Sequence, residues 1–149
     1  MRALPPDRGP AVKVIVETDG AARNNPGPAG IGAVVRTPEG EVLGELAEGL
    51  GETTNNVAEY TAALEGLRLA AELGATDVDL RADSNLLIEQ LSGRYRVKAA
   101  HLRPLYEAVL EQARRFERIS YRHVPREENT HADRLANAGV DAWLAARRR

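Results

Sequence analysis

The stretch VKVIVETD, residues 12–19, decides how the rest of the chain is interpreted. Its β-branched residues alternate with polar ones, which is typical of a strand with one buried face. Two similar runs follow at 30–37 (GIGAVVRT) and 41–50, and Pro38-Glu39-Gly40 supplies a turn between them. We therefore predict three consecutive strands joined as an antiparallel meander.

From Val57 onward the apolar period changes to the helical value. Tyr60, Leu64 and Leu67 recur at helical spacing beside a stripe of small residues, and Gly74 ends the helix. The remaining elements are a strand at 77–82, a helix at 84–91, a helix at 102–116, a strand at 119–124 and a helix at 132–144. The order βββαβααβα predicts an α/β domain, a five-stranded mixed sheet with helices on its faces.

The composition fits one globular domain and excludes several kinds of site. The chain has 149 residues and a formal net charge of -2, so no overall positive field indicates a nucleic-acid partner. The absence of cysteine excludes disulfides, thiolate zinc sites, iron-sulfur clusters and cysteine nucleophiles. We expect a domain at 12–146, a flexible Pro-rich tail at 1–11 and a basic end at 147–149.

The sequence holds no sign of a membrane segment. No apolar run approaches the roughly 20 residues that cross a bilayer, and residues 1–11 hold no hydrophobic block like that of a signal peptide. We therefore expect a cytoplasmic protein with no membrane partner, and a monomer by default.

Four acidic residues lie at the ends of predicted elements. Asp19 ends the first strand and Asp83 the fourth, while Glu59 and Asp133 lie in the first turns of the first and last helices. Taken singly, each has an ordinary explanation. Glu59 and Asp133 each follow an Asn or Thr by three residues, as in a capping box, while Asp83 can cap a helix and Asp19 can belong to a turn.

Together, the four carboxylates favour a site. The first strand and its parallel neighbour bring Asp19 and Asp83 side by side at their carboxyl ends, in the centre of the sheet. Clustered carboxylates repel one another, and oxygen ligands without Cys or clustered His select Mg²⁺ or Mn²⁺ rather than zinc. Two such ions activate water and stabilise the departing oxygen of a phosphodiester, so the pattern favours phosphoryl transfer.

Four local motifs carry a resemblance to a known family. They are TDGAARNNPGPAG at 18–30, TTNNVAEY at 53–60, ADS at 82–84 and HVPREENTHAD at 123–133. In this order they resemble ribonuclease H of type 1 over about residues 12–140, and in particular its short bacterial and archaeal branch, which includes actinobacterial enzymes. The resemblance implies the RNase H-like fold and an endoribonuclease that cuts the RNA strand of RNA/DNA hybrids, leaving 5′-phosphate and 3′-hydroxyl ends.

The resemblance also implies roles for individual residues. The family holds two Mg²⁺ ions, for which Mn²⁺ can substitute, at the positions of Asp19, Glu59, Asp83 and Asp133. His123 matches a mobile histidine that helps to move protons or to release product, a task that suits a titrating imidazole. The alternative for His123 is an ordinary half-buried strand histidine.

Amide side chains are the implied contacts with the hybrid. Asn25, Asn55 and Asn56 match asparagines that contact the groove, and Asn85 stands where relatives often have Gln. Thr54 would hold a phosphate of the DNA strand together with the N–H groups at the helix start. Neutral amides suit this task because they donate and accept across a minor groove. Asn25 and Asn56 also fit turn and cap positions, and both roles can hold at once.

One departure from the family concerns a basic protrusion that longer relatives carry between two helices. Here only GRYRVKAAHLR, residues 93–103, spans the gap, with four Lys or Arg side chains and no acid. The segment either replaces part of the missing grip or is a solvated connector, and we expect modest affinity with a shallow salt dependence. His101 and His131 match no role, and we expect them on the surface.

Two alternatives to a hybrid-cutting hydrolase stay open on the sequence. The first is a non-catalytic hybrid-binding module, which is disfavoured because all four carboxylates are present. The second is a nuclease that also acts on double-stranded RNA, which the missing protrusion permits.

Overall fold

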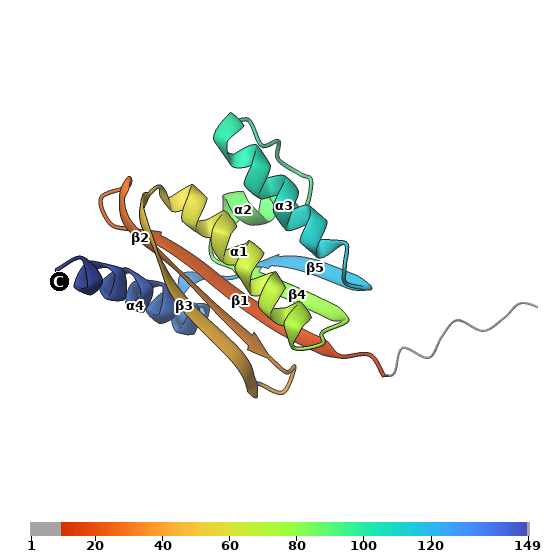
Figure 1. The fold of residues 1–149 in the computed structure, drawn as a ribbon. Helices are drawn as coiled ribbons and strands as arrows, with labels where there is room; N and C mark the ends of the chain where they lie inside the picture. The colour runs from red at the N-terminus through yellow and green to blue at the C-terminus, as the bar shows by residue number, and fades with distance from the viewer. Residues whose placement is uncertain (1–9, 149) are drawn as a thin grey trace, which may run out of the picture.

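The first three strands form the predicted antiparallel meander in this computed structural model, which describes residues 10–148 (Figure 1). They are β1 (Lys13–Ala22), β2 (Gly27–Arg36) and β3 (Val42–Thr53). β1 continues past the predicted end at Asp19, because its last two residues still pair with β2. The residues beyond Asp19 are small, so the alternation that marks a strand in the sequence ends before the backbone pairing does.

The other two strands are parallel to β1. β4 (Asp77–Ala82) pairs with β1, and β5 (Arg118–His123) pairs with β4. The order β3-β2-β1-β4-β5 confirms the five-stranded mixed sheet, with β1 at its centre. Glu17 pairs with Arg81, so Asp19 and Asp83 reach the same edge of the sheet.

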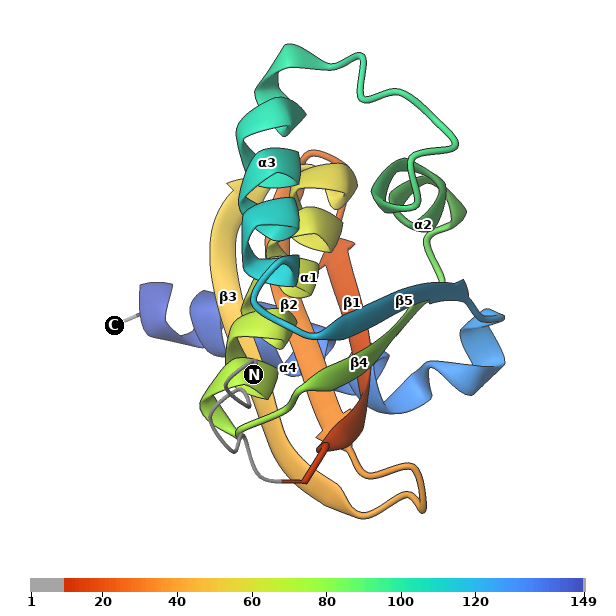
Figure 2. The ribbon, with the colours of Figure 1, turned by 90° about the vertical axis from the view of Figure 1, so that its right-hand side faces the viewer.

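Helices cover both faces of the sheet. α1 (Asn55–Glu72) packs on one face and contacts α3 (Arg103–Ala113), while α4 (Thr130–Arg147) lies across β1, β2 and β3 on the opposite face (Figures 1 and 2). The short α2 (Asn85–Leu91) follows β4, and two single-turn helices, η1 (Ala100–Leu102) and η2 (Arg126–Glu128), precede α3 and α4. Residues 1–9 of the predicted tail and Arg149 of the basic end lie outside the described residues.

Small residues allow these helices to approach the sheet closely. A Cβ atom on Gly66 of α1 would lie 2.8 Å from Cγ2 of Thr18, and one on Gly32 of β2 would lie 2.3 Å from the carbonyl oxygen of Ala132 in α4. The small-residue stripe predicted for the first helix therefore packs on the sheet, as expected. No helix in the described part of the chain is both long enough and apolar enough to cross a membrane.

Candidate active site

Three of the four predicted carboxylates meet at the edge where β1 and β4 end. Asp19 lies in β1, Asp83 directly follows β4, and Glu59 comes from the second turn of α1. One oxygen from each of the three lies within 4.8 Å of the others. They line a cavity of about 490 Å³, and Asp133 lines the same cavity.

Glu59 reaches the cluster because α1 begins directly on β1. A Cβ atom on Gly20 would lie 2.2 Å from the backbone carbon of Ala58, so only glycine allows this approach. The Gly20 N–H donates to Glu59 Oε1 at 3.2 Å, while Oε2 is buried and has no hydrogen-bond partner within residues 10–148. Thr54 caps α1 instead, by accepting from the Val57 N–H at 3.2 Å, so the capping box considered for Glu59 does not form.

Asp133 enters from the first turn of α4. Its carboxyl group lines the same cavity as Asp19 and contributes to the raised pKa of Asp19. Asn137, one turn later, donates to the Asp133 carbonyl at 3.0 Å and accepts from Arg23 Nη2 at 3.2 Å. Thr130, the cap residue of the capping box considered for Asp133, is already the first residue of α4, and Asn129 before it makes no side-chain cap, so this capping box does not form either.

The cluster holds protons in the absence of a cation. Burial, and to a smaller extent the neighbouring carboxylates, raise the pKa of Asp19 to about 10. Burial also raises the pKa of Glu59 to about 8, although the Gly20 N–H opposes the change. The pKa of Asp83 is raised for the same first reason. The cluster offers only oxygen ligands, and Glu59 Oε2 has no partner among the described residues. A hard divalent cation fits these ligands, and on binding it would displace the protons that the carboxyl groups hold.

His123 stands beside this cluster rather than inside it. It is the last residue of β5, it is exposed, and its Nε2 lies 3.3 Å from the Asp83 carbonyl oxygen. This single contact leaves the ring at the rim of the site.

Two of the predicted amide residues cross-link the β1–β2 turn to the start of α1. Asn25 Oδ1 accepts from the Asn55 N–H at 3.0 Å, and Asn55 Oδ1 accepts from the Ala22 N–H at 2.8 Å. The turn also contains Asn24 with a φ of 61° and a cis bond between Asn25 and Pro26. Because both amide oxygens serve the backbone, the Nδ2 groups are the atoms left to donate outward.

The other predicted contacts, Asn56 and Asn85, do not line the carboxylate cavity. Asn55 lines the carboxylate cavity, whereas Asn56 lines a second cavity of about 590 Å³ with Arg96 and Lys98 of the connector. Asn85 is the first residue of α2, which Ser84 caps by accepting from the Leu87 N–H. Asn85 lines neither of these two cavities.

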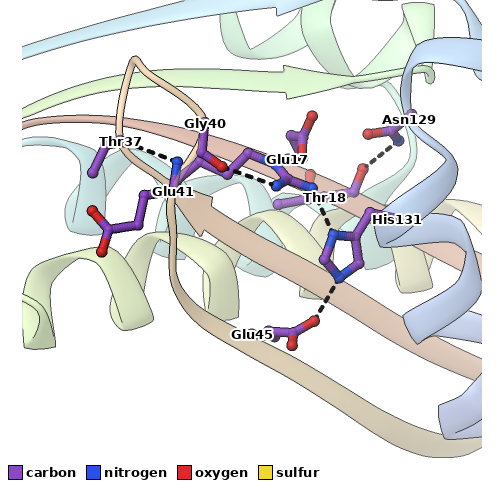
Figure 3. Close-up of polar contacts among 9 residues, drawn as sticks. Glu17, Thr18, Thr37, Gly40, Glu41, Glu45, Asn129 and His131 are labelled. Atoms are coloured by element: carbon purple, nitrogen blue, oxygen red, sulfur yellow. Dashed lines mark hydrogen bonds and ion pairs between the residues drawn. The ribbon is translucent and has the colours of Figure 1, made fainter.

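Two further residues touch the cluster that sequence reasoning missed. Arg126 lines the cavity with its Nη2 4.0 Å from Asp133 Oδ1, and its charge acts to lower the pKa of Asp83. Asn129 is fully buried and donates to the Thr18 carbonyl at 2.9 Å, next to Asp19 (Figure 3). Both residues stand inside the motif HVPREENTHAD. The signals that could have found them are that Arg126 is a cation among acidic residues and that Asn129 is an uncharged amide beside them.

The expectation that His131 is an exposed surface residue is wrong. Its side chain is 24% exposed, and both ring nitrogens are bonded, Nδ1 to Arg36 at 2.6 Å and Nε2 to Glu45 at 2.5 Å (Figure 3). The partners come from β2 and β3, far away in the sequence, so no local pattern indicates them. His101 is exposed, as expected.

The strand order β3-β2-β1-β4-β5, with carboxylates at the ends of the central strands β1 and β4, defines the class of nuclease-like α/β domain to which the chain can be compared. A family model described as reverse transcriptase-like matches residues 17–139. Ribonuclease HI of Halobacterium salinarum is 40% identical over 136 residues, which are 91% of this chain and 67% of that protein. LC11-RNase H1, solved in complex with an RNA/DNA hybrid, is 38% identical with a TM-score of 0.84, over 88% of this chain and 99% of that one.

A bifunctional protein of Mycobacterium tuberculosis is 50% identical over 132 residues, which are 88% of this chain. The solved N-terminal RNase H domain of that protein is 49% identical with a TM-score of 0.88, over 91% of this chain and 99% of the domain. The chain spans only 36% of the length of the whole bifunctional protein. On these similarities the chain belongs to the ribonuclease H family, as the four motifs predict.

Proposed function

We propose that the chain is a metal-dependent endoribonuclease that hydrolyses the RNA strand of RNA/DNA hybrids and leaves 5′-phosphate and 3′-hydroxyl ends. The observation that carries the proposal is the meeting of three carboxylate oxygens within 4.8 Å, with Asp133 at the same cavity. Membership of the ribonuclease H family and the hybrid bound by LC11-RNase H1 support the same reaction and substrate.

In this proposal Asp19, Glu59, Asp83 and Asp133 hold two Mg²⁺ ions, with Mn²⁺ as a substitute. When bound, such ions lower the pKa of an attacking water and stabilise the oxygen that leaves phosphorus. The chain's own part is to bring together four carboxylates from four places in the fold: β1, the end of β4, α1 and α4. His123 supplies or removes a proton at the rim, since among residues 10–148 only one of its ring nitrogens has a hydrogen-bond contact, at 3.3 Å.

The substrate contacts follow from the amide geometry. Asn25 and Asn55 offer N–H donors, which suit the acceptors in a minor groove and the ribose hydroxyl oxygens without distinguishing sequences. Asn56 and Asn85 extend this surface, and Thr54 with the start of α1 holds a phosphate of the DNA strand. We also propose a monomer acting in the cytoplasm, to be checked by light scattering and by cell fractionation.

The test uses a short end-labelled RNA, alone, annealed to DNA or annealed to RNA, with Mg²⁺, Mn²⁺ or EDTA. Cutting of the hybrid that requires a metal, and that Asp83→Asn abolishes, is the expected result. Hybrid binding without cutting would make the chain a binding module. Cutting of the RNA duplex as well would show that the amide contacts discriminate less than we propose.

A further inference from the structure

A hydrogen-bond network of four polar side chains crosses the face of the sheet that α4 covers. Arg36 of β2 donates from Nε to Glu17 of β1 at 2.7 Å, and its Nη2 lies 2.6 Å from His131 Nδ1. His131 Nε2 lies 2.5 Å from Glu45 Oε2 of β3 (Figure 3). The network therefore joins three neighbouring strands to the first turn of α4. None of its members lines the carboxylate cavity.

The hydrogen bonds define one arrangement of the His131 ring. A guanidinium group has donors and no acceptor, so His131 Nδ1 must accept from Arg36. The ring proton then lies on Nε2 and is donated to Glu45. The side chains of Glu17, Arg36 and His131 are 15%, 23% and 24% exposed, so solvent screens the contacts among these three less than it screens a surface ion pair. Glu45 is 44% exposed, so its contact with His131 is more open to solvent.

Two members of this hydrogen-bond network are close in sequence to two of the proposed metal ligands. Glu17 precedes Asp19 by two residues in β1, so both side chains point to the same face of the sheet. His131 precedes Asp133 by two residues in the first turn of α4. A shift of this turn relative to β1 would change the separation of the Asp19 and Asp133 carboxylates.

Packing and hydrogen bonds together hold α4 on the sheet. Cβ atoms on Gly30 and Gly32 of β2 would lie 2.4 and 2.3 Å from carbonyl oxygens of α4, so backbone rests directly on backbone there. This contact sets the distance between helix and sheet, and the side chains of Leu135 and Val140 also pack against these two glycines. At the start of α4, the contacts of His131 and the donation from Asn129 to the Thr18 carbonyl at 2.9 Å add directional hydrogen bonds, which orient the turn that carries Asp133.

We propose that His131 is a positioning residue, which through Arg36 and Glu45 fixes the first turn of α4 and so places Asp133 against Asp19. The inference rests on the proposed function for the role of the two carboxylates. It extends that function to a histidine that does not touch the metals or the substrate.

The experiment compares His131→Ala and His131→Gln with wild type, and uses the exposed His101→Ala as a matched control. Mg²⁺ binding is measured by titration calorimetry without substrate, and kcat and KM are measured on the hybrid. Loss of a residue that orients a metal ligand costs about 10-fold or more in metal affinity or activity. We expect His131→Ala to weaken Mg²⁺ binding and to lower kcat by about this factor, with KM for the hybrid unchanged.

His131→Gln keeps one amide that can donate to Glu45 or accept from Arg36, so it should recover part of both losses. A His131→Ala protein that is folded by circular dichroism and keeps Mg²⁺ affinity and kcat, with only a lower Tm, would overturn the proposal. So would an equal loss in His101→Ala. If His131→Ala does not fold, Glu45→Gln replaces it, and unchanged Mg²⁺ binding in that variant would overturn the proposal as well.

The calorimetric readout separates this inference from the proposed function. If wild-type protein cuts no hybrid, the proposed function fails, while the comparison of Mg²⁺ affinities still tests the positioning role.

Discussion

At the scale of single residues, replacing Asp83 by Asn separates cation binding from the stability of the fold. Burial already raises the pKa of Asp83, although the charge of Arg126 opposes the change, so the charged form is disfavoured without a metal. We expect Asp83→Asn to reduce cleavage by about 1000-fold or more, because several kcal/mol of charge stabilisation are lost. In EDTA its Tm should equal or exceed that of wild type. An Asp83→Asn enzyme of full activity would refute the site assignment.

Arg126 gives a second prediction at this scale. Its exposed guanidinium group lies 4.0 Å from Asp133 Oδ1, so it partly neutralises the cluster and competes with a bound cation. We expect Arg126→Gln to tighten Mg²⁺ binding by about twofold to fivefold, the worth of an exposed ion pair. KM for the hybrid should rise, because a cation at the cavity rim is lost from the phosphate contacts.

Arg134→Gln, an exposed neighbour that does not line the cavity, is the control for this variant. An unchanged Mg²⁺ dependence in Arg126→Gln would show that the two groups do not compete.

At the scale of elements, the connector between α2 and α3 is fastened rather than loose. Gln90 donates to the Arg96 carbonyl at 3.1 Å, and the buried Tyr60 hydroxyl donates to Gln90 Oε1 at 2.6 Å. Val97 packs against the core, whereas Arg96 and Lys98 on either side of it are exposed. Neither cation forms an ion pair with any residue that the structure describes, so both are available for phosphates of a bound strand.

Hybrid binding by the connector is therefore expected to depend on salt. Arg96→Gln and Lys98→Gln should each reduce the slope of log affinity against log salt by about 1. Binding is best measured in the Asp83→Asn background, where the substrate is not cut. Arg114→Gln is the control, because Arg114 pairs with Glu111 at 3.4 Å on α3. Slopes that do not change in the connector variants would make this segment a solvated linker.

At the scale of the whole molecule, the buried cluster links stability to pH. Asp19 and Glu59 have pKa values of about 10 and 8 in the folded protein, above their ordinary values of 3.8 and 4.5. At pH values between the ordinary and the folded-state pKa of each group, the folded protein holds protons that the unfolded chain has released, so the free energy of unfolding falls as pH rises. The contribution is complete below about pH 4 and is lost as pH passes through the folded-state values.

We therefore expect the Tm of metal-free protein to fall between pH 5 and pH 8 more steeply than that of Asp19→Asn, which cannot lose a proton at this position. Thermal scans in EDTA measure the difference, and added Mg²⁺ should reverse the trend at pH 8 because it binds only the folded, deprotonated cluster. Parallel pH profiles of the two proteins would contradict the assignment of this linkage to Asp19.

The sequence by itself determined the order of elements, because alternation and helical spacing are local consequences of which faces are buried. It also placed Asp19, Glu59, Asp83 and Asp133 at element ends, and topology then brings the ends of neighbouring parallel strands together. The four motifs added the family, which the comparisons confirm. These features depend on residues that are close in the chain or on a rule of sheet topology.

Only the tertiary structure decided how the ends are held. His131 bonds partners 95 and 86 residues away, and Asn129 reaches Thr18 across 111 residues. Such contacts leave no period in the sequence, because their geometry depends on how α4 lies across three strands. The same reason explains why His131 was expected at the surface.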